Sequence, residues 1–344
     1  MMKSMRKVLT IASTAGLLLG TVAAVDAQDG TNPNIGKDAP ALEIAGWATE
    51  KSITQEELDK SPHVLEFWAT WCPPCLESVP HLNEMSQRLE PFGLKVVGLS
   101  NESMEKVKPF AQDMGMTYYV AAGHEMEGLE FRGIPFAAAV GTDGKVAWAG
   151  HPMDPAFEKA LWKMTQDFTP TALQPALAKA QDGPLGPAYA ALGAVEHAKA
   201  KAARATIEGN LSLRLELAGA ADGIDQYNAL HATSELYEGV PGADKANARM
   251  KTLLEDPEVM KAVELQKPIQ DLEAALRGIQ AKAAKMQEEK SEMEVMEYYL
   301  NAILPVFEAF VKDNPEHPEA PQIKQAINQI ETQLETLKGG AAAE

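Results

Sequence analysis

Two cysteines, Cys72 and Cys75, are the residues of this sequence whose type and spacing point to chemistry. They are the only cysteines in 344 residues, and two residues separate them. A strand-like run (64–68) leads into the pair and a helix-like run (75–89) leads out of it. Cys72 is therefore expected where a helix begins, beside backbone N–H groups that have no partner within the helix. A thiolate is stabilised there, so we expect the pKa of Cys72 to lie below the free-thiol value of about 8.5.

The neighbouring residues fit a pair that exchanges disulfides. Pro73 falls in the first helical turn, where its missing N–H has no consequence. Cys75, one turn further along, is expected to attack a mixed disulfide formed on Cys72 and to release the reduced partner. This scheme requires that the folded protein leave Cys72 open to solvent.

A structural disulfide and half of a zinc site are the two alternatives for this pair. A structural bridge usually closes a long loop, whereas a four-residue ring removes little entropy from the unfolded chain. A zinc site needs two more ligands, and the sequence has no second C-x-x-C and no H-x-H cluster. We therefore expect a redox pair, with no metal and no other cofactor.

The stretch 67–75, Phe-Trp-Ala-Thr-Trp-Cys-Pro-Pro-Cys, resembles the active site of the thioredoxin superfamily. Its Thr-Trp-Cys version, with Pro80 following, is similar to the exported TlpA/ResA-like thiol–disulfide oxidoreductases. The resemblance covers about residues 35–152. The sequence Gly-Ile-Pro at 133–135 is similar to the cis-proline loop of the family, and 137–149 is similar to its terminal hairpin.

This resemblance implies an α/β thioredoxin-like domain, with a central mixed sheet flanked by helices. It also implies that the Ile134–Pro135 bond is cis and faces the cysteines. The backbone of Ile134 would then pair with an extended segment of a client protein, a form of strand addition. The substrate-binding residues implied in this way are Trp71, Pro73, Pro74, Ile134 and Pro135.

Glu66 is the third catalytic candidate, after Cys72 and Cys75. It lies inside the predicted strand, where a buried carboxylate is costly unless it is neutral, solvated or functional. By resemblance, this is where thioredoxins carry a buried acid that takes the proton of the second cysteine, whereas TlpA/ResA-like proteins carry theirs at the position of Ser78. We hypothesise that Glu66 is the general base for Cys75, with a pKa raised by burial. The alternatives are exposure on the other strand face, or a structural ion pair with a lysine.

The N-terminus has the pattern of an export signal. Basic residues among the first seven precede an uncharged apolar run (8–25), which ends in a small-residue cleavage pattern. We expect cleavage between Ala27 and Gln28. An uncleaved membrane anchor is the alternative, but the run is rich in Ala, Gly, Ser and Thr and is weakly hydrophobic for a span. The mature protein is thus expected to be periplasmic or secreted, without a stable membrane anchor.

The formal net charge of −18 argues against nucleic acid and anionic membranes as partners, because both would repel the chain. The length allows two domains. Beyond a linker at 169–171, alanine, glutamate, lysine and glutamine dominate. We predict a signal peptide (1–27), a thioredoxin-like domain (28–169), an all-α C-terminal domain (170–338) and a disordered tail (339–344).

The predicted helical domain has breaks at 182–187, 239–243 and 314–321. Two of the breaks lie in similar segments, 240–246 and 314–320, which resemble a degenerate helical-hairpin repeat of the tetratricopeptide kind. Between them, apolar residues recur every three or four positions from Ile269 to Phe307. Such a stripe is usually ordinary core. A homodimer seam or a client groove is the alternative.

Three functions are compatible with these patterns. The first is an exported thiol–disulfide oxidoreductase that exchanges disulfides with client proteins, served by an unidentified electron donor or acceptor, and by resemblance a reductant more than a general oxidant. The second is a helical protein-binding scaffold with the thioredoxin-like domain as an accessory platform. The third is a thiol peroxidase, but Ala69 stands where peroxiredoxins need a threonine three residues before the reactive cysteine.

Overall fold

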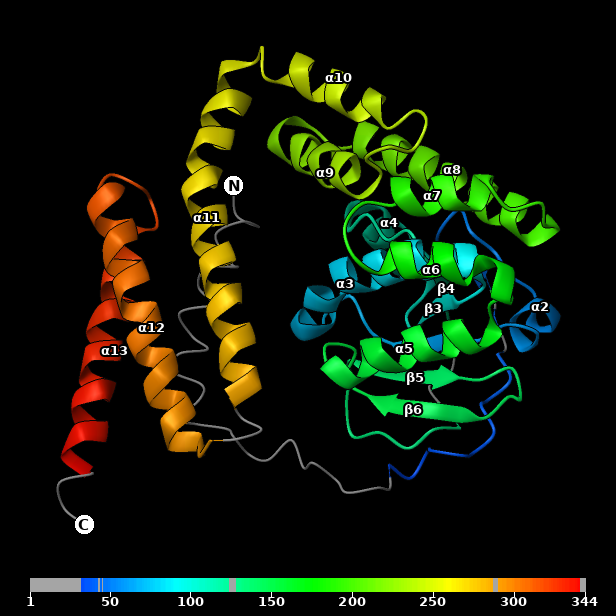
Figure 1. Ribbon diagram of the computed structural model, residues 1–344, viewed down its shortest axis with the longest axis horizontal. Coiled ribbons are helices and arrows are strands. Elements are labelled where there is room, and N and C mark those ends of the chain that lie inside the picture. The colour runs from blue at the N-terminus through cyan, green and yellow to red at the C-terminus, as the bar shows by residue number, and fades with distance from the viewer. Residues whose placement is uncertain (1–31, 43, 45, 124–127, 287–289, 341–344) are drawn as a thin grey trace. The chain divides into compact units, whose positions relative to one another are not determined.

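The computed structural model describes residues 32–42, 44, 46–123, 128–286 and 290–340 (Figure 1). The predicted signal peptide with its cleavage site, and residues 341–344 of the predicted tail, lie outside these residues. None of the described helices is both long enough and apolar enough to span a bilayer. The chain folds as two compact units, one comprising residues 30–256 and the other containing residues 257–344.

A six-stranded mixed sheet is the centre of the first unit. Its strands, in the spatial order β1-β4-β3-β2-β5-β6, include two parallel pairs, β2 with β3 and β3 with β4, and the other pairs are antiparallel. This confirms the predicted thioredoxin-like sheet. The strands are β1 (Gly46–Trp47), β2 (His63–Phe67), β3 (Lys95–Ser100), β4 (Tyr119–Ala122), β5 (Phe136–Val140) and β6 (Val146–Gly150).

Both faces of this sheet are covered, so its central strands are apolar on both sides. On one face, Val64 and Val96 belong to a core cluster into which α3, α4 and α5 bury side chains. On the other face, Leu65 and Val97 belong to a second cluster, which includes Leu58 of α2. The flanking helices are α2 (Gln55–Asp59), α3 (Pro73–Leu89), α4 (Met104–Asp113) and α5 (Pro155–Phe168).

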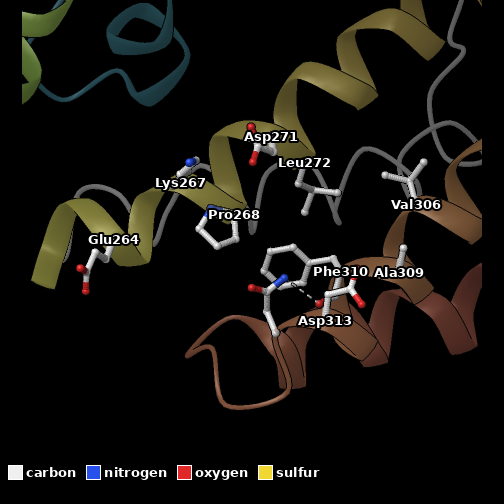
Figure 2. A pocket seen from close by; sticks show the side chains of 10 residues that line it. Glu264, Lys267, Pro268, Asp271, Leu272, Val306, Ala309, Phe310 and Asp313 are labelled. Carbon is white, nitrogen blue, oxygen red and sulfur yellow. Dashed lines mark hydrogen bonds between the residues drawn. The ribbon is translucent and has the colours of Figure 1, made fainter.

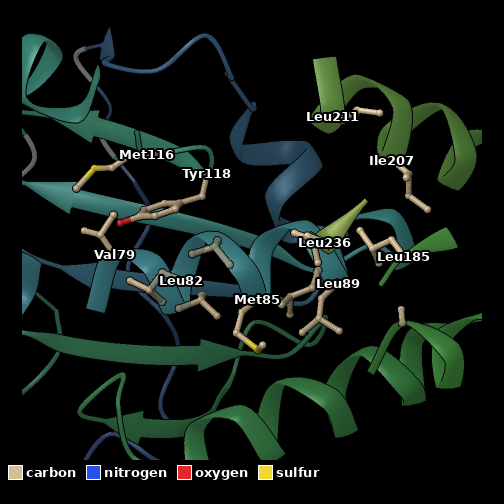
Figure 3. Packing of buried hydrophobic residues seen from close by; sticks show 14 of the residues in the cluster. Val79, Leu82, Met85, Leu89, Met116, Tyr118, Leu185, Ile207, Leu211 and Leu236 are labelled. Atoms are coloured by element: carbon tan, nitrogen blue, oxygen red, sulfur yellow. The ribbon is translucent and has the colours of Figure 1, made fainter. Parts of the chain in front are cut away.

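The first core cluster continues beyond the sheet into five further helices. Leu185, Ile207, Leu211 and Leu236 lie in the same cluster as Leu89 of α3 (Figure 3). The compact unit therefore ends near residue 256, and the predicted boundary between residues 169 and 170 falls inside it. The helices concerned are α6 (Gln174–Gln181), α7 (Gly186–Gly193), α8 (Ala198–Gly219), α9 (Gly223–Leu236) and α10 (Asp244–Leu253).

Buried polar contacts reinforce this junction at the end of α3. The Arg88 guanidinium donates hydrogen bonds to the carbonyl oxygens of Ala180 and Gly183, at 2.9 and 2.8 Å. Asn210 of α8 donates to the buried carboxylate of Glu90, in the short 3-10 helix η1 (Glu90–Phe92), at 3.1 Å. Because buried polar groups need partners, these bonds fix the orientation of α6 and α8 on the sheet domain.

The second unit contains three helices among its described residues: α11 (Pro257–Met286), α12 (Glu292–Asp313) and α13 (Ala320–Gly340). The apolar stripe that runs from Ile269 to Phe307 lies in the core that these helices share, except for Met293, which is 60% exposed. The interpretation of this stripe as ordinary core is thus confirmed. Because α13 extends to Gly340, the first two residues of the predicted tail are helical.

A pocket of about 470 Å³ lies between α11 and α12 of this unit (Figure 2). Leu272 and Phe310 give it an apolar part, and Lys267, Asp271 and Asp313 add charged groups. Both cysteines belong to the other unit. The pocket is therefore no part of the site described next.

Candidate active site

Cys72 is the N-cap residue of α3, as the sequence predicted. Its backbone is extended (φ −98°, ψ 95°), and its Sγ accepts a hydrogen bond from the backbone N–H of Cys75 at 3.3 Å. Pro73 and Pro74 occupy the first helical turn, where their missing N–H groups leave no donor unpaired. The strand β2 ends at Phe67, so a five-residue segment (68–72) links the sheet to the sulfur.

The two cysteines form a disulfide, with an S–S distance of 2.08 Å. The protein is therefore described in its oxidised state. No group of three His, Cys, Asp or Glu side chains in the described part of the chain is placed to hold a metal ion.

Cys72 is less accessible than the sequence analysis requires. Only 3% of Cys72 and 1% of Cys75 is exposed, although Pro73 and Pro74 are exposed and Trp71 is 70% exposed. The physical reason is that both cysteines pack into the core cluster under the sheet. In the disulfide form, little of Cys72 is therefore open to an incoming thiolate.

The loop before β5 faces the disulfide. The Ile134–Pro135 peptide bond is cis, as the resemblance implied. The carbonyl oxygen of Ile134 lies 3.7 Å from the Cys72 Sγ. Phe136, which follows Pro135, pairs with Phe67 at the end of β2. This register brings the proline loop to the same end of the sheet as the cysteines. Pro135 is buried and Ile134 is half-buried, which leaves part of this loop open to solvent.

Glu66 is buried in the middle of β2, paired with Gly98 on one side and Ala137 on the other. It is 1% exposed, and its Oε2 has no hydrogen-bond partner among the described residues. Neither alternative for this residue, an exposed position or an ion pair with a lysine, therefore describes it. Burial raises the pKa of Glu66 to about 8.

The side chain of Glu66 shares a buried polar site with two aromatic residues. The Trp68 Nε1 and the Tyr118 hydroxyl are also buried without a partner in the described structure. A Cβ atom on Gly98 would lie 3.2 Å from Glu66 Oε2, 3.1 Å from Trp68 Nε1 and 3.0 Å from the Tyr118 ring. The absence of a side chain at Gly98 therefore makes room for this group. Trp68 belongs to the cluster that contains Cys75, and Glu66, two residues earlier in the strand, lies on the same face.

Ser78 occupies the position where the resemblance places an acid in TlpA/ResA-like proteins. It is buried, and its hydroxyl donates a hydrogen bond to the carbonyl oxygen of Cys75 at 2.7 Å. Ser78 thus bonds to the backbone of α3, whereas Glu66 is a fully buried acid on the sheet face that α3 covers.

Glu102 is a residue of this site that the sequence analysis missed. Its carboxylate accepts hydrogen bonds from the backbone N–H of Thr70 at 2.6 Å and from the Thr70 hydroxyl at 2.9 Å. The signal available in the sequence was an acid two residues after the predicted strand 95–100, at the sheet end where the cysteines were expected. Thirty-two positions separate Glu102 from Thr70, so only the sheet topology brings the two residues together.

Comparison with known proteins agrees with this geometry. Residues 35–147 match the model of the AhpC/TSA family. This part of the chain belongs to the AhpC/TSA family, which is thioredoxin-like.

Named relatives of this AhpC/TSA region come from several bacteria. The chain is 31% identical over 116 residues to a protein of Bacillus thuringiensis (strain Al Hakam) named thiol-disulfide oxidoreductase ResA. That alignment covers 33% of this chain and 66% of the relative, just under two thirds of its length. A Vibrio cholerae protein named thiol:disulfide interchange protein DsbE is 29% identical over 138 residues, which cover 36% of this chain and 73% of the relative.

Solved structures similar to this region include a thiol-disulfide isomerase from Corynebacterium glutamicum, at 19% identity and a TM-score of 0.34. That alignment covers 38% of this chain and 96% of the other. A protein from Chlorobium tepidum described as a putative DsbE has 24% identity and a TM-score of 0.32, and its alignment covers 39% and 96% of the two chains.

Proposed function

We propose that this protein is an exported thiol–disulfide oxidoreductase that exchanges disulfides with client proteins through Cys72 and Cys75. The observation that carries the proposal is the disulfide at the first turn of α3, with the carbonyl oxygen of Ile134 3.7 Å from Cys72 Sγ. The names of the ResA and DsbE relatives support the same class of reaction.

The reaction runs in two exchange steps. In the reduced protein, the Cys72 thiolate attacks a client disulfide, forms a mixed disulfide and expels one client thiolate. The Cys75 thiolate then attacks Cys72 Sγ, which closes the Cys72–Cys75 bond and expels the second client thiolate. The client gains two electrons and the protein loses them, which leaves the oxidised pair described above. A separate electron donor must then reduce this pair.

Glu66 manages the proton of Cys75 in this scheme. A general base works best when its pKa lies close to that of the group it deprotonates, and free thiols have a pKa of about 8.5. Burial brings the pKa of Glu66 to about 8, within reach of that value. The role is supported by the location of Glu66 on the sheet face that α3 covers, because its strand neighbour Trp68 shares a core cluster with Cys75.

The client binds, in this proposal, along the half-buried Ile134 loop. An extended client segment pairs with the Ile134 backbone, and the exposed Trp71 ring contacts the client on the other side of the disulfide. Pro73, Pro74 and Pro135 complete the apolar surroundings. Because Cys72 is little exposed, we expect the residues around it to shift slightly when a client binds.

Export and the reducing direction are also parts of the proposal. Export is supported by the basic, apolar and small-residue pattern of residues 1–27. The reducing direction is supported by the resemblance to TlpA/ResA-like proteins.

The unit containing α11, α12 and α13 is the candidate for contact with a second copy of the chain. Sedimentation of the full chain would detect such a homodimer.

Trapping of a client tests the proposed function. A Cys75→Ser variant should accumulate a mixed disulfide between Cys72 and a disulfide-bonded test protein, because the resolving sulfur is missing. The wild-type protein, supplied with a thiol donor, should reduce the same test protein, and a Cys72→Ser variant should not. No trapped adduct and no reduction by the wild-type protein would contradict the proposal.

Two outcomes would favour the alternative functions. An effect in cells that persists in the double Cys72→Ser/Cys75→Ser variant would favour the protein-binding scaffold. Consumption of peroxide would favour the thiol peroxidase.

A further inference from the structure

The carboxylate of Glu102, in the connection that follows β3, holds the turn that carries Cys72. Glu102 follows β3, and one of its oxygens accepts the backbone N–H of Thr70 while the other accepts the Thr70 hydroxyl, at 2.6 and 2.9 Å. Within the turn, the N–H of Cys72 donates to the carbonyl oxygen of Ala69 at 3.1 Å. Two bonds from one carboxylate fix both the position and the orientation of Thr70, two residues before the sulfur.

Glu102 is itself anchored through its backbone. Its N–H donates to the Ser100 hydroxyl at 3.3 Å, and its carbonyl oxygen accepts the N–H of Gly123 at 2.9 Å. Ser100 ends β3 and Gly123 follows β4, so the ends of two adjacent strands hold the carboxylate in place. A group held by rigid elements keeps its charge at a constant distance from the reacting sulfur.

The charge on Glu102 is only weakly neutralised. Its side chain is 8% exposed, so water screens it poorly. Among the described residues, the one basic side chain within 4.0 Å is Lys106, whose Nζ lies 3.7 Å away and whose side chain is 69% exposed. A negative charge close to a thiol disfavours the thiolate, whereas the N-terminus of α3 favours it.

We propose that Glu102 is a positioning residue that holds the Thr70–Cys72 turn and, through its negative charge, destabilises the Cys72 thiolate, which makes the Cys72/Cys75 pair a stronger reductant. The link to redox direction is thermodynamic. A dithiol whose thiolate is stabilised favours the reduced state and is oxidising as a disulfide, and a destabilised thiolate has the opposite effect. This inference rests on the proposed function, because it concerns the same exchange of two electrons with a client.

The test compares wild-type protein with a Glu102→Gln variant in glutathione redox buffers. Glutamine keeps an acceptor for Thr70 but removes the charge. We expect the equilibrium of the variant to shift toward the reduced dithiol by three- to tenfold, where tenfold corresponds to about 30 mV. We also expect the Cys72 thiolate to form at lower pH, as followed by its ultraviolet absorbance. Equal equilibrium constants and equal thiolate titrations in the two proteins would overturn the inference.

Two further variants keep the test specific. Glu105→Gln removes an equal charge from an exposed position of α4 and should leave the equilibrium unchanged. If Glu105→Gln shifts the equilibrium as much as Glu102→Gln does, the shift is due to the net charge of the protein and not to the position of Glu102, and the inference is wrong. Lys106→Met removes the nearby cation from an exposed side chain and should shift the equilibrium toward the disulfide, which tests the proposal even if Glu102→Gln fails to fold. Failure of the wild-type disulfide to equilibrate with glutathione at all would contradict the proposed function, while the thiolate titration of the reduced proteins would still test Glu102.

Discussion

At the scale of single residues, the catalytic role proposed for Glu66 comes with a cost to the stability of the fold. The carboxyl group is fully buried, and its Oε2 has no partner among the described residues. With a pKa of about 8 in the folded protein and 4.5 as the ordinary value, the folded state holds a proton that the unfolded state releases between these pH values. The contribution of Glu66 to the free energy of unfolding must therefore fall as the pH rises from 4.5 to 8, by at most about 5 kcal/mol.

The variant Glu66→Gln removes this titrating group. We expect it to be more stable than the wild-type protein at pH 9 and to differ little at pH 4.5, because the wild-type carboxyl is then neutral in the folded state. Urea unfolding at the two pH values measures the effect, with the exposed Glu77→Gln as the control. A pH dependence of unfolding that is the same in wild type and Glu66→Gln would contradict the burial argument.

The same variant tests the catalytic assignment. Loss of a positioned general base usually slows a reaction about 100-fold or more. We expect Glu66→Gln to slow the release of client from the mixed disulfide on Cys72 by about this factor near neutral pH, while formation of that mixed disulfide changes little. Rapid-mixing measurements of the two steps separate these effects. Unchanged release would remove Glu66 from the mechanism.

At the scale of elements, helix α3 has different roles at its two ends. Its first turn presents the cysteines, whereas its last turn anchors the helices that follow the sheet, through Arg88 and the carbonyl oxygens of Ala180 and Gly183. Arg88 is largely buried, and its Glu84 partner is half exposed. The main contribution of the guanidinium is therefore to satisfy two backbone acceptors at the end of α6.

Replacement of Arg88 by Ala should therefore weaken the junction. Two carbonyl oxygens lose a charged donor, which we expect to lower the free energy of unfolding by about 1–3 kcal/mol. The control is Lys163→Ala in α5, whose ion pair with Asp167 is exposed on both sides and should contribute less than about 0.5 kcal/mol. Urea unfolding compares the two variants. A similar loss for both would show that the buried bonds add little.

At the scale of the whole molecule, the compact units do not follow the change in composition at residue 169. The first unit keeps α6 to α10 on the sheet domain, because Leu177, Leu192 and Leu211 share its core. The unit of α11, α12 and α13 has an apolar core of its own. The catalytic chemistry proposed here thus belongs to a unit of about 227 residues, not to the region matched by the AhpC/TSA family alone.

Two truncated proteins test this division. A chain of residues 28–256 should unfold cooperatively and keep the redox activity of the Cys72/Cys75 pair. A chain of residues 28–169 should be less stable and aggregate, because it exposes the apolar residues that share a core with α6 to α9. Circular dichroism on heating and light scattering provide the comparison. Equal stability of the two chains would show that the later helices are an independent domain.

The sequence by itself determined the features that depend on neighbours along the chain. The spacing of Cys72 and Cys75, the prolines after Cys72 and the strand-like run before the pair specify where α3 and β2 lie, because caps and apolar runs act over a few residues. The resemblance supplied the cis bond at Pro135, which the structure contains. It also supplied the mixed sheet.

Only the tertiary structure decided the features that depend on residues distant in sequence. Glu102 reaches Thr70, Gly98 makes room beside Glu66, and Arg88 reaches Ala180, each across dozens of positions. In the sequence, Glu102 and Arg88 have the appearance of ordinary surface charges. Their burial, and the inclusion of α6 to α10 in the first unit, follow from which apolar faces meet in space, and local patterns carry no information about that pairing.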